Sequence, residues 1–228
     1  MDHFHFREGQ YFAEGVPLAR IASAVGTPCY VYSRAILEQQ WRLFDDAFGD
    51  YPHRIHYAVK ANGNLAILNL LCQMGSGFDI VSGGELERVL KAGGRPDDVV
   101  FSGVGKRESE ITSALETGIH CINVESAAEL DRVDRIAGTL GVVADIALRI
   151  NPDVDPHTHP YIATGLRETK FGVPTDQVPD LVRQAHDASH VKIIGLACHI
   201  GSQLTELSPF TAALDRVLDL VFSLRQES

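Results

Sequence analysis

The sequence predicts an α/β fold in which a parallel β-sheet alternates with helices, as an incomplete (β/α)8 barrel or as an open doubly wound sheet. Six short apolar segments alternate with six segments of helical periodicity. Two of the helices open with a Ser-x-x-Glu capping box shortly after a strand, at Ser82 and Ser126. The first strand is not followed by Gly-x-Gly-x-x-Gly, and there is no P-loop, so dinucleotide and nucleotide binding lose their main support.

The N-terminal part precedes this repeat. Aromatic residues on both sides of a Glu8-Gly9 turn predict a hairpin, and Ser33 has the position of a helix N-cap. We expect a hairpin over His3–Phe12, a helix over Pro17–Val25, a strand over Cys29–Tyr32 and a helix over Arg34–Phe48.

The strand–helix repeat follows. The predicted strands are Ile55–Val59, Phe78–Val81, Val99–Ser102, Cys121–Val124, Ile146–Ile150 and Ile193–Cys198. The predicted helices are Leu65–Met74, Gly84–Ala92, Glu108–Glu116, Ala127–Leu140, Val178–Ala188 and Phe210–Leu224. A closed barrel of this class needs eight strands, so six strand–helix units make an incomplete one.

The charge and composition exclude several classes of partner. The 228 residues carry 20 Lys and Arg against 30 Asp and Glu, a formal net charge of −10. We therefore expect no nucleic acid or membrane surface as a partner. No apolar stretch has membrane-spanning length, and Met1–Gln10 lacks the apolar core of a signal peptide. The four cysteines are widely spaced and are interpreted as buried, reduced thiols of a cytoplasmic protein.

Polar residues gather where the predicted strands end, which in a parallel barrel is the edge that carries function. Lys60 follows an apolar strand, so we expect a packed stem and an amine that can form a Schiff base. The alternative is a lysine that simply reaches solvent. His199 also follows a strand and offers a ring that can stack on a flat heterocycle, or else an ordinary hydrogen-bonded core histidine.

Three further residues at this edge have both functional and structural interpretations. Ser202 follows Gly201 and offers a hydroxyl for a phosphate group, although turn chemistry explains it equally well. Asp79 and Arg149 are candidates for lining a cofactor site, and a structural ion pair between them is the alternative.

A long loop, Pro152–Thr169, contains His157 and His159 close to acidic residues. Two histidines at this spacing can ligate a metal, but a solvated loop is the better interpretation, and we predict no metal site. Loops of this length in compact domains often serve function, so we expect this one to face the substrate.

Several segments, in order along the chain, resemble one known family. They are His56–Asn62, Gly77–Leu86, Phe101–Lys106, Asn123–Ser126, Arg149–Val154, Lys170–Val173 and Cys198–Gln203. Together they resemble the pyridoxal-phosphate-dependent decarboxylases of fold type III, whose barrel is like that of alanine racemase. Within that family, Thr158–Gly165 looks most like the diaminopimelate decarboxylases.

The resemblance implies a cofactor, a reaction and a set of site residues. It implies pyridoxal 5′-phosphate, decarboxylation of meso-2,6-diaminopimelate to L-lysine in lysine biosynthesis, and a homodimer of the full-length protein. The implied catalytic residues are Lys60, as the Schiff-base lysine, and His199, which stacks on the pyridine ring. The implied cofactor-binding residues also include Ala58, Asp79 and Arg149 around the ring and Ser202 at the phosphate.

The family's later motifs are not found in these 228 residues. They are a triple-glycine phosphate loop, a Glu-Pro-Gly-Arg segment and a C-terminal β-domain. We therefore interpret residues 1–32 as a hairpin and strand that belong with that second domain, and residues 33–228 as a partial barrel of a truncated family member. The alternatives are a non-catalytic or inactive cofactor-binding fragment, or a related decarboxylase of arginine, ornithine or carboxynorspermidine.

Overall fold

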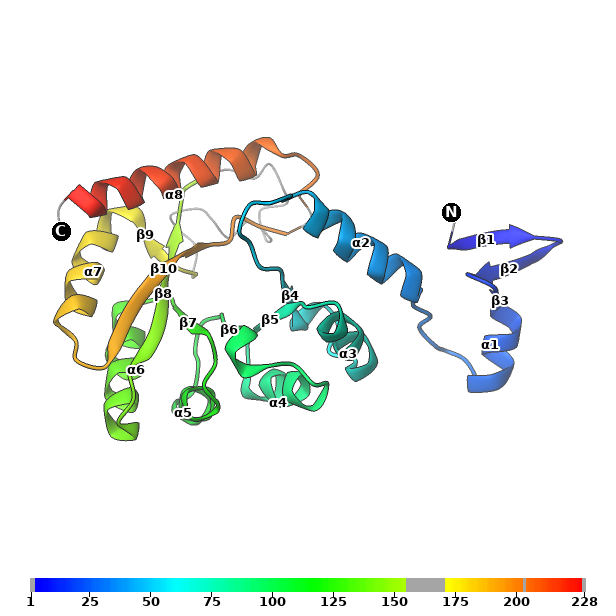
Figure 1. Cartoon of the computed structure of the whole chain (residues 1–228), viewed down its shortest axis with the longest axis horizontal. Coiled ribbons are helices and arrows are strands. Elements are labelled where there is room, and N and C mark those ends of the chain that lie inside the picture. The colour runs from blue at the N-terminus through cyan, green and yellow to red at the C-terminus, as the bar shows by residue number, and fades with distance from the viewer. Residues whose placement is uncertain (1–2, 155–170, 203, 227–228) are drawn as a thin grey trace. The chain divides into compact units, whose positions relative to one another are not determined.

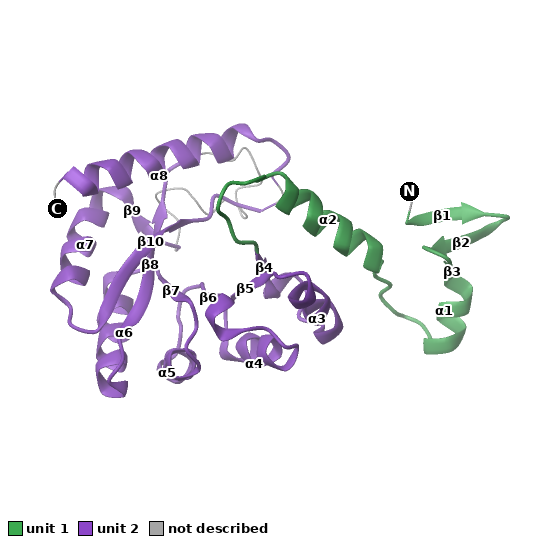
Figure 2. Ribbon diagram, in the orientation of Figure 1, with its two compact units in different colours: residues 1–55 green, residues 56–228 purple. Residues whose placement is uncertain are grey.

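The computed structural model describes residues 3–154, 171–202 and 204–226. The chain divides into two compact units, Met1–Ile55 and His56–Ser228, coloured separately in Figure 2. The predicted boundary between residues 32 and 33 lies inside the first unit and stays a prediction.

The first unit combines a small antiparallel sheet with two helices. Strands β1 (Phe4–Arg7) and β2 (Gln10–Ala13) form the predicted hairpin, and β3 (Val16–Pro17) adds to β2. Helices α1 (Leu18–Val25) and α2 (Arg34–Asp46) follow. The Ser33 hydroxyl caps α2 as predicted, because its Oγ accepts from Ile36 N–H at 3.1 Å.

One element predicted for this unit is wrong. Residues Cys29–Tyr32 form no strand, although their composition favours one. No part of the chain that the structure describes pairs with them, and Tyr30 is 90% exposed. A β-rich composition describes residues that fit a pleated surface, and a strand forms only where a neighbour supplies that surface.

The second unit is built on parallel strands that run in sequence order across the sheet (Figure 1). Each strand pairs with the next, so the order never reverses as it does in a doubly wound sheet. The two-residue strand β9 (Val173–Pro174) pairs with β8. The main strands are β4 (His56–Ala58), β5 (Gly77–Ile80), β6 (Val99–Phe101), β7 (Cys121–Val124), β8 (Ala144–Asn151) and β10 (Val191–Cys198). All six predicted strands and the barrel-type order are therefore present, while β4 and β10 have a single neighbour each within the described residues.

Helices follow the strands and lie along the outer side of the sheet (Figure 1). The α-helices are α3 (Leu65–Gln73), α4 (Gly83–Lys91), α5 (Glu108–Thr117), α6 (Ala127–Leu140), α7 (Val178–Asp187) and α8 (Ser208–Gln226). Short 3-10 helices are η1 (Val59–Ala61), η2 (Pro96–Asp98) and η3 (Thr175–Gln177). The Ser82 and Ser126 hydroxyls accept from the N–H of Glu85 and Glu129, at 3.3 and 3.2 Å, so both predicted caps form.

The core lies between the sheet and these helices. Alternate strand residues point to opposite faces of a sheet. Phe78 and Ile80 on β5 are fully buried, and Asp79 between them lines a cavity on the other face. The same alternation buries Leu148 and Ile150 on β8 and places Arg149 at that cavity. Helices contribute fully buried Leu68, Leu86, Ile111 and Leu130.

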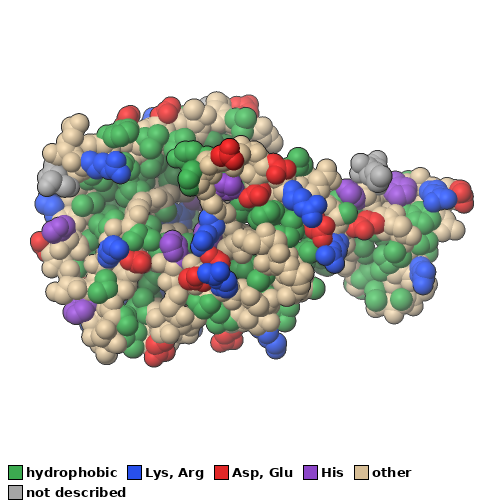
Figure 3. Space-filling model, in the orientation of Figure 1, with side chains coloured by type: hydrophobic (Ala, Val, Ile, Leu, Met, Phe, Trp, Pro, Cys, Tyr) green, Lys and Arg blue, Asp and Glu red, His purple; other side chains and the backbone are tan. Residues whose placement is uncertain are grey.

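On the face drawn in Figure 3, basic and acidic side chains are interspersed rather than gathered in a basic patch. No helix within residues 3–154, 171–202 and 204–226 is long and apolar enough to cross a membrane. The expectation of buried thiols is wrong for Cys29 and Cys198, which are exposed, whereas Cys121 is buried.

Candidate active site

The carboxyl ends of the parallel strands surround a cavity of about 340 Å³. Four of the six predicted site residues line it: Lys60, Asp79, Arg149 and His199. They come from η1, β5, β8 and the segment after β10, so the fold brings together residues up to 139 positions apart, the difference between 199 and 60. The other lining residues are His56, Val81, Val100, Ser102, Gly103, Asn123, Phe171, Ala197 and Cys198.

Lys60 lies in a 3-10 helix rather than at the end of a strand. Strand β4 ends at Ala58, and η1 (Val59–Ala61) turns the chain there. Val59 is 1% exposed and anchors the turn, whereas Lys60 is exposed. The turn places the amine of Lys60 at the cavity, where a small molecule can reach it.

Asp79 holds a desolvated carboxyl group. Burial raises its pKa, and the Ser102 hydroxyl and the positive charges of Lys60 and Arg149 act in the opposite direction. Its Oδ1 is buried and finds no hydrogen-bond partner among the described residues. A buried oxygen without a partner is costly, so Asp79 offers an acceptor to a group that enters the cavity.

Arg149 pairs with Glu125, not with Asp79 as one interpretation of the sequence suggested. Its Nη1 lies 2.9 Å from Glu125 Oε1, and both side chains are almost fully buried. The guanidinium lies over the ring of Phe171, 5.0 Å from the centroid. Its Nε is buried and has no hydrogen-bond acceptor within the described residues. Arg149 therefore presents a fixed cation with one donor still available.

His199 carries a neutral ring at this site. Desolvation lowers its pKa, and the positive charges of Arg149 and Lys60 lower it further. A neutral imidazole has a flat face that can stack on another flat ring without the cost of desolvating a charge.

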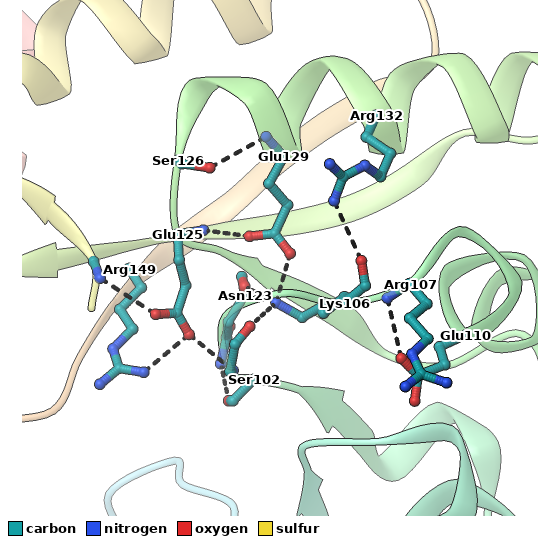
Figure 4. A network of polar contacts seen from close by, with 12 residues as sticks. Ser102, Lys106, Arg107, Glu110, Asn123, Glu125, Ser126, Glu129, Arg132 and Arg149 are labelled. Carbon is teal, nitrogen blue, oxygen red and sulfur yellow. Dashed lines mark hydrogen bonds and ion pairs between the residues drawn. The ribbon is translucent and has the colours of Figure 1, made fainter. Parts of the chain in front are cut away.

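A buried polar network supports one side of the cavity (Figure 4). Lys106, 3% exposed, donates from Nζ to Gly103 O, Asn123 O and Glu129 Oε1, at 2.7, 2.8 and 2.8 Å. The other oxygen of Glu129 accepts from the N–H of Glu125 at 2.8 Å. All three donor positions of this ammonium are used, so Lys106 joins the ends of β6 and β7 to helix α6.

Two predicted residues do not line the cavity. Ala58 is half-buried on β4, and Ser202 is exposed beyond the end of β10. Their assigned roles stay predictions. The loop histidines His157 and His159, and Tyr161 of the segment that looked most like diaminopimelate decarboxylases, lie outside the described residues. Within the described ranges, no cluster of His, Cys, Asp or Glu is arranged to hold a metal ion.

Several lining residues were not selected from the sequence. Ser102 and Asn123 belong to the polar residues at the strand ends, and their place on the same face as Asp79 follows from strand alternation. His56 begins β4 on the face that also carries Ala58, and the same alternation could have identified it. Phe171 follows the long loop, and no spacing rule places it at Arg149.

A larger groove of about 570 Å³ lies elsewhere, between α7, β10 and α8. Its lining is mainly apolar and includes none of the predicted site residues. We place the chemistry at the smaller cavity, because an amine, a carboxyl group, a guanidinium and an imidazole converge only there among the described pockets.

The residues of this cavity suit a flat aldehyde with polar substituents. Lys60 supplies an amine nucleophile, His199 a neutral flat face, and Arg149 a cation with a free donor. The orphaned Oδ1 of Asp79 supplies an acceptor. Pyridoxal 5′-phosphate is such a molecule, and its aldehyde and ring fit this set of side chains.

Comparison with known proteins identifies relatives of this chain. Residues 34–228 match the family model described as pyridoxal-dependent decarboxylase, pyridoxal binding domain. The whole chain is 59% identical to a diaminopimelate decarboxylase of Vibrio cholerae and covers 55% of it. Over 97% of its length it is 57% identical to a diaminopimelate decarboxylase of Pseudomonas aeruginosa and covers 53% of that protein. The chain thus spans about half the length of the curated relatives it matches.

Solved structures of diaminopimelate decarboxylases are also similar to this chain. Diaminopimelate decarboxylase of M. jannaschii in complex with L-lysine matches 99% of this chain and 54% of its own, with a TM-score of 0.93 and 37% identity. The enzyme of Helicobacter pylori, also complexed with L-lysine, has a TM-score of 0.89 at 42% identity, over 92% of this chain and 53% of its own. The lysine decarboxylase of Selenomonas ruminantium matches 99% of this chain and 54% of its own at a TM-score of 0.83 and 23% identity, and shares the fold alone.

Proposed function

Because the chain belongs to the pyridoxal-dependent decarboxylases and contains their pyridoxal-binding domain, we propose that the protein decarboxylates meso-2,6-diaminopimelate to L-lysine. Pyridoxal 5′-phosphate is held on Lys60. The observation that carries the proposal is the convergence of Lys60, Asp79, Arg149 and His199 on one cavity at the carboxyl ends of parallel strands. The identity of 59% and 57% to diaminopimelate decarboxylases supports this substrate over arginine or ornithine.

Each residue has a role that follows from its surroundings. Lys60 would hold the cofactor through Nζ, because it is the amine at the cavity. His199 would stack on the pyridine ring, since desolvation keeps its imidazole neutral. Arg149, fixed by Glu125, would donate from Nε to an oxygen of the cofactor or substrate.

Asp79 would accept a hydrogen bond from the cofactor or substrate. Its Oδ1 has no hydrogen-bond partner among the described residues, and it lines the same cavity as Lys60. When bound, the cofactor supplies the electron sink that accepts the electrons of the bond to the departing carboxylate.

The same proposal includes assembly and location. We propose that the full-length protein is a homodimer in the cytoplasm. The family resemblance supports the dimer, and the four free cysteines suit a reducing compartment. Light scattering after size exclusion tests the dimer directly.

The proposed activity is tested by CO2 release from meso-diaminopimelate, with arginine and ornithine as competing substrates and Lys60→Ala as the control. We expect release from diaminopimelate in the presence of pyridoxal phosphate and none from the Lys60→Ala protein. Release from arginine or ornithine instead would overturn the substrate. Cofactor attachment without any release would favour a non-catalytic pyridoxal-phosphate-binding protein.

A further inference from the structure

Glu125 lies behind the cavity and does not line it, yet it contacts three segments that do. The residue follows β7 and is 6% exposed. Its Oε1 accepts from Gly103 N–H at 2.8 Å and from Arg149 Nη1 at 2.9 Å. Its Oε2 accepts from Gly172 N–H at 3.2 Å. Figure 4 shows the Glu125 carboxylate and the guanidinium of Arg149 pointing toward each other.

The backbone of Glu125 is itself fixed. Its N–H donates to Glu129 Oε2 at 2.8 Å, and the other oxygen of Glu129 binds the buried ammonium of Lys106. That ammonium also binds the carbonyl oxygens of Gly103 and Asn123. The carboxylate is thus held in position from both its side chain and its main chain.

These contacts fix the side chain of Arg149. Glu125 holds Nη1, and Phe171 covers the face of the guanidinium at 5.0 Å. Gly172, the next residue, is tied to the same carboxylate. The ion pair and the aromatic ring therefore hold the Arg149 side chain in one conformation. In this conformation Nε is still available for a ligand.

Stability alone is a weak explanation for this network. Two buried ion pairs, Lys106–Glu129 and Arg149–Glu125, carry a desolvation cost that their attraction offsets only with good geometry. Apolar side chains of the same volume often stabilise a core as well or better. The fixed placement of Arg149 is what such a network supplies and an apolar core does not.

We infer that Glu125 is a positioning residue, which clamps Arg149 against Phe171 so that the guanidinium meets the cofactor or substrate in one geometry. The inference deepens the proposed function and rests on it for the identity of the ligand. Its test uses the cofactor-free chain, so its failure and that of the proposed function are distinguishable.

The clamp has an electrostatic signature at His199. The negative charge of Glu125 raises the pKa of His199, against the lowering by desolvation and by Arg149 and Lys60. Within residues 3–154, 171–202 and 204–226, the titratable or charged groups that face His199 or share its cavity are His56, Lys60, Asp79, Glu125, Arg149 and Cys198.

The test is Glu125→Gln in the full 228-residue chain without cofactor, followed by NMR. Glutamine keeps the size of the side chain and removes its charge. We expect the nuclear Overhauser contacts between Arg149 and the Phe171 ring to weaken. We also expect the C2 proton of His199 to titrate at a lower pH than in the wild type. A merely structural role would leave the Arg149–Phe171 contacts unchanged in a folded variant, whereas removal of the Glu125 charge by itself lowers the pKa of His199.

The matched control is Glu108→Gln, which removes the charge of an exposed glutamate paired with Arg135. We expect it to leave both signals unchanged. Unchanged Arg149–Phe171 contacts in folded Glu125→Gln would overturn the inference, whether or not His199 titrates at a lower pH.

If Glu125→Gln does not fold, hydrogen exchange of the wild-type chain tests whether Glu125 clamps Arg149. We expect Gly172 N–H and the Arg149 guanidinium protons to exchange only with global unfolding, because both bind the Glu125 carboxylate. Fast exchange at these groups would mean that the clamp does not form, and the inference would be wrong.

Discussion

Asp79 shows how the fold sets the chemistry of a single residue. It follows one fully buried residue of β5 and precedes another, so it must point to the cavity side of the sheet. There it loses water and gains the influence of Lys60 and Arg149, and desolvation is the larger effect. A carboxyl group in these conditions resists ionisation more than an exposed one does.

This shift has a consequence for the pH dependence of stability. Because its folded-state pKa is raised above the ordinary value of 3.8, the folded chain retains the Asp79 proton at a pH where the unfolded chain has lost it. Stability from this group therefore falls as pH rises through that window. We expect Asp79→Asn to be stabilised relative to wild type by an amount that grows with pH above 3.8.

Urea unfolding at several pH values measures this difference in the cofactor-free chain. Asp219→Asn, at an exposed position on α8, serves as the control and is expected to show little pH-dependent difference. A difference for Asp79→Asn that stays constant with pH, or shrinks as pH rises, would show that the carboxyl group is not desolvated as described.

Gly172 allows the close approach of a loop to the site. Its φ is +70°, and a Cβ there would lie 2.6 Å from Asn151 Oδ1 and 3.1 Å from the Arg149 carbonyl oxygen. Gly105 has nearly the same φ, +71°, but a Cβ there would meet nothing within 4 Å. The two glycines therefore separate backbone strain from steric overlap.

We expect Gly105→Ala to cost about 1–2 kcal/mol, from left-handed strain alone. Gly172→Ala should cost more, by roughly 1–3 kcal/mol, because the new methyl group also displaces atoms around Arg149. Denaturant midpoints of the two variants give the comparison. Equal losses of stability would indicate that the segment at Gly172 does not pack on Asn151.

The sequence predicted where some site residues lie, but not which partners they have. Asp79, Arg149 and His199 were identified because strand ends in a parallel barrel gather at one edge. The pairing of Arg149 with Glu125 was not, because both Asp79 and Glu125 stand at that edge and spacing does not choose between them. The position of Lys60 in a 3-10 helix was not predicted either, because η1 has only three residues and shows no periodicity.

At the scale of elements, a capping box can do more than begin a helix. The Ser126–Glu129 box predicted a helix start, and the serine cap forms at 3.2 Å. No local pattern indicated that Glu129 would also bind Lys106, because that lysine lies 23 residues away. Local patterns thus predicted α6, while its connection to β6 and β7 required the folded chain.

The Lys106–Glu129 pair should behave as a coupled unit. We expect Lys106→Met alone to cost about 3–5 kcal/mol, because it leaves a buried carboxylate without its cation. Glu129→Leu alone should be of similar size. The double variant should lose clearly less than the sum of the two, because neither charge is left unpaired.

A double-mutant cycle by urea denaturation measures this coupling. Arg135 and Glu108, an exposed pair between α6 and α5, provide the comparison, with an expected coupling of at most about 1 kcal/mol. Additive losses at Lys106 and Glu129 would contradict the buried network.

Short elements were the ones that sequence patterns missed. Strand β9 has two residues, and β3 has two, so neither shows an alternation. The segment Cys29–Tyr32 shows the opposite error, since its composition favoured a strand that has no described partner. The apolar segments in β5, β7 and β8 were predicted because their buried residues leave a clear pattern.

For the molecule as a whole, binding of the cofactor should stabilise the folded chain by mass action. Pyridoxal phosphate at 100 times its dissociation constant contributes about 2.7 kcal/mol. For a chain of this size that amount raises Tm by roughly 5–11 °C. We expect this rise in a thermal melt of the wild type and a smaller one with pyridoxine 5′-phosphate, which lacks the aldehyde. Equal shifts with both compounds would mean that no covalent attachment contributes.

The central claim is that Lys60 holds pyridoxal phosphate, and the visible absorbance of the chain mixed with the cofactor tests it most directly. Wild type and Lys60→Ala are dialysed after mixing and compared. We predict a new visible band that survives dialysis in the wild type and is absent in Lys60→Ala. A band that persists in Lys60→Ala, or no retained band in the wild type, would contradict the assignment of Lys60.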